Sequence, residues 1–258
     1  MNSVFNAKVT KKTKFENCYI SFDPTDCGNS IGAALYVAHC IHGKKRSKDK
    51  TLSYLGPDYS DDEIETVLKR RKISYTKSKN ISQDVAALLA KDEIVANFMG
   101  KMEFGDRALG NRSILASPKN PKIKDKINSM IKYRESYRPF APVCHFDKAS
   151  KYFDVTENYE CLFMEKVITV KPEYQKKLSA ITHVDGSGRL QTISTHQNPL
   201  LYELISNFEK LSKYPIILNT SFNINGEPIV MSPDDALNTF YNSGLKYLRI
   251  GNFLIEKI

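Results

Sequence analysis

Two stabilising devices are missing from this sequence: a disulfide framework and a cysteine-based zinc site. The chain has five cysteines, an odd number, and none of them form a C-x-x-C pair. A disulfide framework needs an even number of cysteines, and cysteine-rich zinc sites commonly contain C-x-x-C pairs. We therefore interpret the five as buried or half-buried thiols. They are Cys18, Cys27, Cys40, Cys144 and Cys161.

Long apolar runs are also missing. No stretch approaches the roughly 20 apolar residues that cross a bilayer, and the opening residues MNSVFN lack the apolar core of a secretion signal. These absences predict a cytoplasmic protein without a membrane partner. No recognisable nucleic-acid motif accompanies the net charge of +9. Small anions are therefore a better prediction than nucleic acid for the partner of this basic chain.

The chain is nevertheless long and apolar enough to fold around a proper core. Its 258 residues are 41% hydrophobic, which allows one large domain or two small ones. We find no internal repeat and no low-complexity tract. The best boundary is the basic, apolar-poor run at residues 43–50, which predicts an exposed loop or linker.

Positive charge concentrates in the middle of the chain. Residues 101–138 hold ten Lys or Arg against four Asp or Glu, and so carry +6 of the net +9. Such a run is usually a solvated face. Here the charges alternate with Met102, Phe104 and Leu109, which favours partial burial.

Two arginines of this region lie on constrained backbone. Gly105 and Gly110 flank Arg107, and Pro139 pushes Arg138 toward extended geometry. Planar guanidinium groups held in fixed positions suit a phosphate or carboxylate. The sequence therefore predicts a site for an anionic ligand.

The pattern of elements predicts a mixed α/β fold. Helices are expected after a capping box at residues 60–63, near residues 82–91 and 123–131, from Asn198-Pro199 to residue 211, and from Ser232-Pro233 onward. Strands are expected near residues 93–99, 163–170, 180–184, 189–194, 214–218 and 247–255. The run at 214–218 is continuously apolar, as in a strand buried on both faces. It leads directly into the polar cluster Asn219, Thr220, Ser221 and Asn223.

The amino-terminal part, residues 19–40, predicts a strand end, a glycine-containing turn and an Ala-rich helix. Asp26 in the turn has two interpretations, a helix cap or a metal ligand, and capping is the commoner role. His39 and His42 lie three residues apart, which without an acidic partner is more typical of a structural pair.

The blocks just described resemble the O-carbamoyltransferases of the NodU/CmcH type. The resemblance rests on DCG at residues 26–28, YLGP at 54–57, MEFG at 102–105, residues 107–115, RPFAP at 138–142, THVDG at 182–186, and GEPIV at 226–230. These blocks follow the family's order over nearly the whole chain. Two departures are Lys101 and Asp106, where the family usually has Arg and Pro.

The resemblance implies a fold and a domain organisation. Residues 1–45 are similar to the last strand and helix of an actin-like (Kae1-like) domain, and residues 51–258 to a YrdC/Sua5-like twisted sheet with flanking helices. Most of the actin-like domain would then belong to a separate amino-terminal chain, or be lost.

It also implies an activity with specific cofactors. The YrdC-like part is expected to form carbamoyl adenylate from ATP and carbamoyl phosphate, with Mg²⁺ as a cofactor. The adenylate would serve O-carbamoylation of a hydroxyl on a sugar or natural product. An iron-like metal would bind Asp26 only with ligands from the absent amino-terminal part. The alternative is a catalytically incomplete remnant that binds nucleotide as a regulatory subunit.

Residues carried over from the family fall into two groups. Lys132, Arg107 and Arg138 are the expected catalytic cations, and we expect them to converge with Arg189 on one pocket. The expected substrate- and nucleotide-binding residues are Arg134, His183, Arg189, Asn219, Thr220, Ser221 and Asn223. The pairs Lys132 with Arg134 and Ser221 with Asn223 match the KxR and SxN signatures of YrdC-like relatives.

Overall fold

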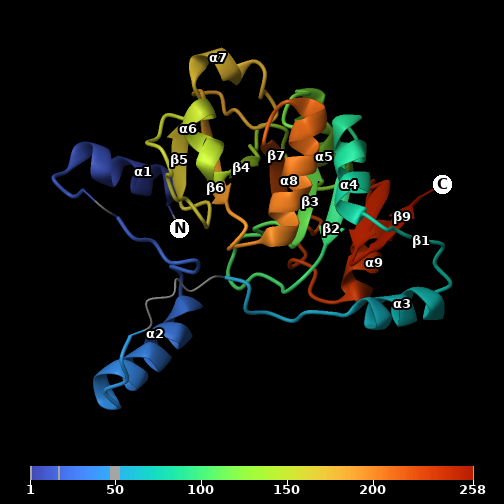
Figure 1. Ribbon diagram of the computed structural model, residues 1–258, viewed down its shortest axis with the longest axis horizontal. Coiled ribbons are helices and arrows are strands. Elements are labelled where there is room, and N and C mark those ends of the chain that lie inside the picture. Colours follow the sequence, from blue (N-terminus) through green and yellow to red (C-terminus); the bar gives the residue numbers. More distant parts are fainter. Residues whose placement is uncertain (1, 17, 47–52, 258) are drawn as a thin grey trace.

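The computed structural model describes residues 2–16, 18–46 and 53–257. Its centre is one mixed nine-stranded sheet in the order β1-β9-β8-β2-β3-β7-β4-β6-β5. The strands are β1 (Thr76–Lys77), β2 (Val95–Phe98), β3 (Arg112–Ala116), β4 (Ala141–His145), β5 (Lys166–Thr169), β6 (Ser187–Ile193), β7 (Ile216–Ser221), β8 (Tyr247–Ile250) and β9 (Phe253–Glu256). This architecture confirms the mixed α/β class with flanking helices (Figure 1).

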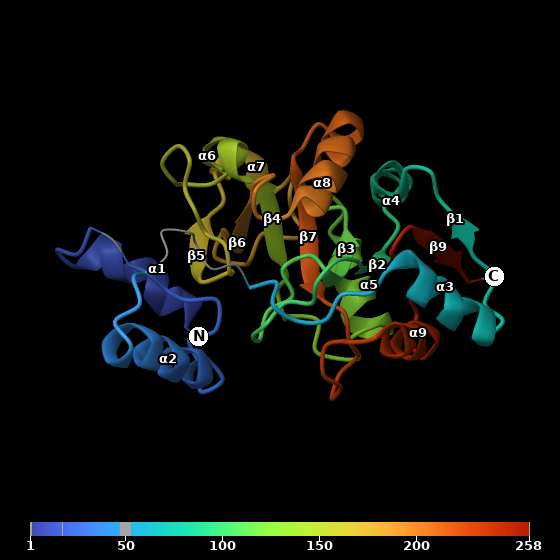
Figure 2. The ribbon, with the colours of Figure 1, turned by 60° about the horizontal axis from the view of Figure 1, so that its bottom comes forward.

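Helices cover both faces of the sheet. They are α1 (Ser3–Lys12), α2 (Gly28–Tyr36), α3 (Asp61–Arg70), α4 (Ile81–Ala90), α5 (Lys122–Met130), α6 (Ala149–Tyr152), α7 (Pro172–Gln175), α8 (Pro199–Ser212) and α9 (Pro233–Tyr241). Helices α4 and α8 pack together on one face, while α3, α5 and α9 lie on the other (Figure 2). Each face therefore has its own apolar cluster.

The helix starts follow from their capping residues. Ser60 and Glu63 form a capping box at α3, and Ser232 and Asp235 form another at α9. Asn198 accepts a hydrogen bond from the backbone of α8, whose first residue is proline. These side chains satisfy amide groups that a helix leaves unpaired at its amino end.

Three strand predictions differ from the structure. Residues 180–184 form turns, in which the backbone N–H of Ile181 donates to the carbonyl oxygen of Leu178 and that of Ala180 to the carbonyl oxygen of Pro118. The run at 247–255 is two strands, β8 and β9, which reverse at Gly251, where φ is +56°. In the amino-terminal part, described residues 2–46 contain no strand, and α2 follows an irregular segment. Apolar runs alone do not distinguish a strand from a buried turn.

The amino-terminal segments lie at the β5 end of the sheet (Figure 1). Helix α1 packs on β5, and Phe22 joins an apolar cluster with Leu109 and Phe163. Helix α2 buries none of its residues fully, and it continues as a single π-helical turn at Val37–Ile41. The predicted linker at 43–50 falls partly on residues 47–50, outside the described residues, so the domain boundary there stays a prediction. No helix in the described ranges is long and apolar enough to cross a membrane.

Candidate active site

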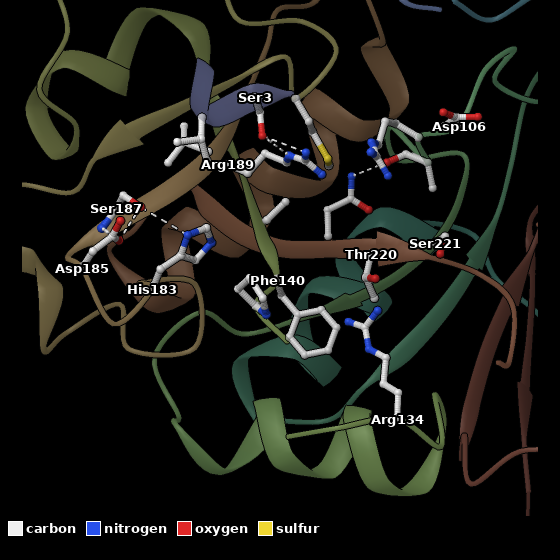
Figure 3. A pocket seen from close by; sticks show the side chains of 18 residues that line it. Ser3, Asp106, Arg134, Phe140, His183, Asp185, Ser187, Arg189, Thr220 and Ser221 are labelled. Atoms are coloured by element: carbon white, nitrogen blue, oxygen red, sulfur yellow. Dashed lines mark hydrogen bonds between the residues drawn. The ribbon is translucent and has the colours of Figure 1, made fainter. Parts of the chain in front are cut away.

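Strand directions bring distant parts of the sequence to one edge of the sheet. Strands β4 and β6 are parallel and β7 is antiparallel to β4, so the starts of β4 and β6 lie beside the end of β7. A cavity of about 420 Å³ opens there (Figure 3). Seven of the predicted binding or catalytic residues line it: Arg107, Arg134, His183, Arg189, Asn219, Thr220 and Ser221.

The loop that carries Arg107 is held from inside by a buried carboxylate. Glu103 accepts hydrogen bonds from the backbone N–H groups of Leu109 at 2.6 Å and Asn111 at 2.8 Å, and its other oxygen accepts from that of Arg112 at 3.2 Å. Burial raises the pKa of Glu103, while these bonds act in the opposite direction. Gly105, with φ of +106°, lets the loop pass close to Phe22. Arg107 is thereby presented on fixed backbone.

Arg107 and Arg189 form the cationic side of the cavity. Burial lowers the pKa of Arg189, and electrostatic repulsion from the guanidinium group of Arg107 lowers it further. Nε of Arg107 is buried without a hydrogen-bond partner. Arg189 donates to Oγ of Ser3 in α1 from Nε at 2.9 Å and from a terminal nitrogen at 2.7 Å (Figure 3). Paired like charges with an unused donor suit an anion.

Arg134 approaches the cavity from the loop after α5. Its Nε donates to Oδ1 of Asn128 at 2.8 Å, and its guanidinium lies 5.0 Å from the ring centre of Phe140 (Figure 3). Burial, and then repulsion from Arg138, lower its pKa. The stacked, anchored side chain is a third cation at this site.

Lys132 lies behind the cavity wall and is not part of its lining. Its ammonium group donates to the Ser221 hydroxyl at 3.1 Å, the Asn223 backbone oxygen at 2.9 Å and Asn223 Oδ1 at 2.7 Å, and it also donates to the Ser221 backbone oxygen. Burial, followed by repulsion from Arg134, lowers its pKa to about 7. The geometry makes Lys132 a positioning residue for Ser221 and Asn223. Neither Lys132 nor Asn223 lines the cavity.

His183 belongs to a small hydrogen-bonded cluster at the other end of the cavity. Its Nδ1 lies 3.2 Å from the hydroxyl of Ser187, which donates to Asp185 at 2.6 Å (Figure 3). Nε2 of His183 is buried without a hydrogen-bond partner. Burial lowers the pKa of His183, whereas hydrogen bonds from Ser187 lower that of Asp185. The cluster therefore presents a neutral imidazole beside a carboxylate at neutral pH.

Arg138 and Asp26 are also absent from the cavity lining. Arg138 is exposed and its Nε pairs with Glu135 at 2.9 Å, so the expected convergence of four cations holds for Arg107 and Arg189 but not for Lys132 or Arg138. The ion pair with Glu135 holds Arg138 at the surface, where half of its side chain is exposed. Asp26 is also exposed. Among the described residues no group of three His, Cys, Asp or Glu side chains could hold a metal, so a metal at Asp26 would need ligands from elsewhere.

Sequence reasoning missed several lining residues. Ser3 comes from α1, which has no apolar periodicity to predict it, and Asp185 and Ser187 fell within a predicted turn. The acid Asp106, recognised as a departure from the family, lies in the lining beside Arg107.

Comparison with known proteins decides the family. Residues 86–257 match the family model described as carbamoyltransferase C-terminus. The chain belongs to the carbamoyltransferase family. The matched range includes every cavity-lining residue except Ser3 and Val4.

Carbamoyltransferase relatives extend well beyond this chain. Nodulation protein NolO of Bradyrhizobium diazoefficiens is 39% identical over 99% of this chain and 47% of its own length. Nodulation protein NolNO of Sinorhizobium fredii is 37% identical over 99% of this chain and 38% of its own. The chain therefore spans about half the length, or less, of these relatives.

A solved structure resembles part of the fold. Full-length HypF, in a phosphate- and nucleotide-bound form, has a TM-score of 0.47 and 18% identity over 67% of this carbamoyltransferase chain and 25% of that chain.

Proposed function

We propose that this chain binds ATP and carbamoyl phosphate and forms carbamoyl adenylate, the activated donor for O-carbamoylation of a hydroxyl on a sugar or natural product. The observation that carries the proposal is a cavity lined by three arginines, one of which has a buried donor without a partner, together with a buried neutral acceptor of Asn219. Membership of the carbamoyltransferase family supports it.

The cationic side fits the phosphate. Arg107 and Arg189 repel each other, and an anion between them would relieve that repulsion. Nε of Arg107 has no partner within the described structure. Bidentate guanidinium contacts also fix the orientation of a phosphate.

The neutral side fits the carbamoyl group. Oδ1 of Asn219 is buried without a hydrogen-bond partner. An unsatisfied buried acceptor is costly, and a ligand N–H group would satisfy it. Carbamoyl phosphate carries such N–H groups next to its phosphate.

The proposed reaction needs charge neutralisation more than it needs a protein nucleophile. A carbamate oxygen bonds to the α-phosphorus of ATP while the bond from that phosphorus to the bridging oxygen breaks, releasing pyrophosphate. Atom balance requires carbamoyl phosphate to give up its own phosphate to water first, so inorganic phosphate is a second product. Arg107, Arg134 and Arg189 would neutralise the phosphate oxygens.

Other groups of the site have supporting roles in this proposal. Thr220 and Ser221 offer hydroxyl groups to the ligands from the end of β7, and Lys132 holds Ser221 in place. Mg²⁺ would accompany the nucleotide phosphates, and Asp106 is an exposed carboxylate of the lining that suits it.

Pyrophosphate release from ATP, measured with and without carbamoyl phosphate, tests the proposal. We expect release that depends on carbamoyl phosphate and falls at least about tenfold in Arg107→Ala and Lys132→Ala. Lys126→Ala, an exposed lysine of α5, is the matched control and should retain full activity. No release by folded wild-type protein, with or without a candidate partner chain, would reject the proposal.

A separate amino-terminal chain is the proposed partner. Helix α2 and the turn after it leave Leu35, Tyr36, Val37 and Ile41 exposed, an apolar surface that soluble proteins usually cover. Relatives about twice as long contain a further half that could cover it. That half would also supply the missing ligands for a metal at Asp26. We keep the cytoplasm as the proposed compartment.

The second candidate is a regulatory subunit that binds nucleotide without turnover. It is favoured by the length of the match, because the chain covers only 47% of the length of NolO. Calorimetry that detects ATP binding, combined with no carbamoyl adenylate by mass spectrometry, would select this candidate. Detection of the adenylate would dispose of it.

A further inference from the structure

We propose that Gln191 fixes the orientation of the Asn219 carboxamide, and that Oδ1 of Asn219 thereby selects a carbamoyl group over other acyl groups of similar size. This inference rests on the proposed function, because it assigns the part of the cavity that reads the carbamoyl nitrogen.

Gln191 and Asn219 reach each other across a strand. Gln191 belongs to β6 and Asn219 to β7, and β4 lies between them in the sheet. Residue Ala141 of β4 lies opposite Asn219, and Val143 lies opposite Gln191. Residues paired across strands share one face, and alternate residues of a strand do so as well. The small side chain of Ala141 leaves room on that face for the two amides to meet.

The direction of both amides is dictated by backbone carbonyl groups, which can only accept. Nε2 of Gln191 donates to the carbonyl oxygen of Leu109 at 2.9 Å, which leaves Oε1 of Gln191 as an acceptor. Nδ2 of Asn219 donates to that Oε1 at 2.9 Å and to the carbonyl oxygen of Ala108 at 3.1 Å. Flipping either amide would set two acceptors, or two donors, against each other.

Oδ1 of Asn219 is consequently left as an acceptor without an internal partner. Asn219 is 1% exposed and lines the cavity, and Oδ1 has no hydrogen-bond partner. Gln191 is fully buried. The two carbonyl groups that orient the pair directly follow Arg107 in the chain, so the same loop presents a phosphate-binding cation and sets the acceptor. The same loop therefore positions both the cation that would bind a phosphate and the acceptor that would bind an adjacent N–H group.

An unpaired acceptor such as Oδ1 of Asn219 would distinguish acyl phosphates that differ in one group. Carbamoyl phosphate has an NH₂ group where acetyl phosphate has a methyl group of similar size. The NH₂ group can donate to Oδ1, whereas the methyl group would leave this buried acceptor unsatisfied. Sites built to bond an N–H reject analogues that lack it more strongly than they reject a change in size.

Equilibrium binding of three probes tests the inference: carbamoyl phosphate, acetyl phosphate and inorganic phosphate. Wild-type protein should bind carbamoyl phosphate about tenfold more tightly than acetyl phosphate. Asn219→Ala should abolish this preference. Gln191→Met, which removes the bond to Nδ2 at nearly constant volume, should reduce it to about twofold. Affinity for inorganic phosphate should stay within about twofold in both variants.

The outcomes separate the two proposals. Equal wild-type affinities for carbamoyl and acetyl phosphate would overturn the role of Asn219 while leaving the anion site intact. A preference that survives in folded Asn219→Ala would do the same. A preference lost in Asn219→Ala but unchanged in Gln191→Met would overturn the orienting role of Gln191. If none of the three probes binds wild-type protein, the proposed function fails, and the inference fails with it.

Discussion

Lys132 makes the stability of this protein depend on pH in a direction that can be calculated. Burial lowers its pKa from 10.5 to about 7 in the folded state. Between these two values the unfolded chain binds about one more proton than the folded chain. Unfolding free energy therefore rises with pH across this window. The contribution is complete above 10.5, and it is lost as pH falls through about 7.

The magnitude follows from the size of the shift. One pKa unit corresponds to about 1.4 kcal/mol, so the full window is worth about 5 kcal/mol. Between about pH 6 and about pH 8.5 the lysine accounts for about 2 kcal/mol. Other groups also titrate in this range, so the comparison has to be made against a variant in which only Lys132 is changed.

Denaturant unfolding of wild-type and Lys132→Met at these two pH values provides the assay. We expect the wild-type free energy to rise by about 2 kcal/mol more than that of the variant. The exposed Lys126→Met is the control and should keep the wild-type slope. Parallel pH dependence in wild-type and Lys132→Met would show that the lysine titrates normally and would refute the reasoning.

Three further predictions concern the cavity and its supports. Arg107→Ala should weaken phosphate binding at least about tenfold in calorimetry, whereas the exposed Arg138→Ala should change it less than about twofold; similar losses in both would contradict the assignment. Ser3→Ala should strengthen phosphate binding, because Arg189 loses an internal partner that competes with the ligand, and weaker binding would argue that Ser3 holds Arg189 in its binding position. Glu103→Gln should lower unfolding free energy by about 2 to 4 kcal/mol in denaturant titration, because a buried carboxylate that accepts three backbone N–H groups is replaced by an amide with one acceptor; a change below about 0.5 kcal/mol would contradict that role.

Local patterns in the sequence predicted much of the fold. The capping box at Ser60 and the Asn198-Pro199 pair placed α3 and α8, because capping chemistry depends on neighbouring residues. The sequence predicts one strand where the structure has the hairpin of β8 and β9, since the reversal needs only Gly251 with positive φ. The pairing order of the sheet depends on contacts between distant residues, which one sequence does not display.

The sequence likewise predicts only part of the candidate site. Arg107 lies between glycines on a loop that lines the cavity, whereas Arg138, predicted from the same pattern of charge, pairs with Glu135 at the surface. The sequence does not distinguish these two arginines, because tertiary packing decides which of them lines the cavity. The contact of Ser3 with Arg189 joins residues that are 186 positions apart and has no local signal in the sequence.

A structure determined with carbamoyl phosphate tests the central claim most directly. We expect its phosphate between the guanidinium groups of Arg107 and Arg189, and its nitrogen within hydrogen-bond distance of Asn219 Oδ1. A ligand bound elsewhere, or a cavity that stays without ligand at a saturating concentration, would contradict the assignment of this cavity as the carbamoyl phosphate site.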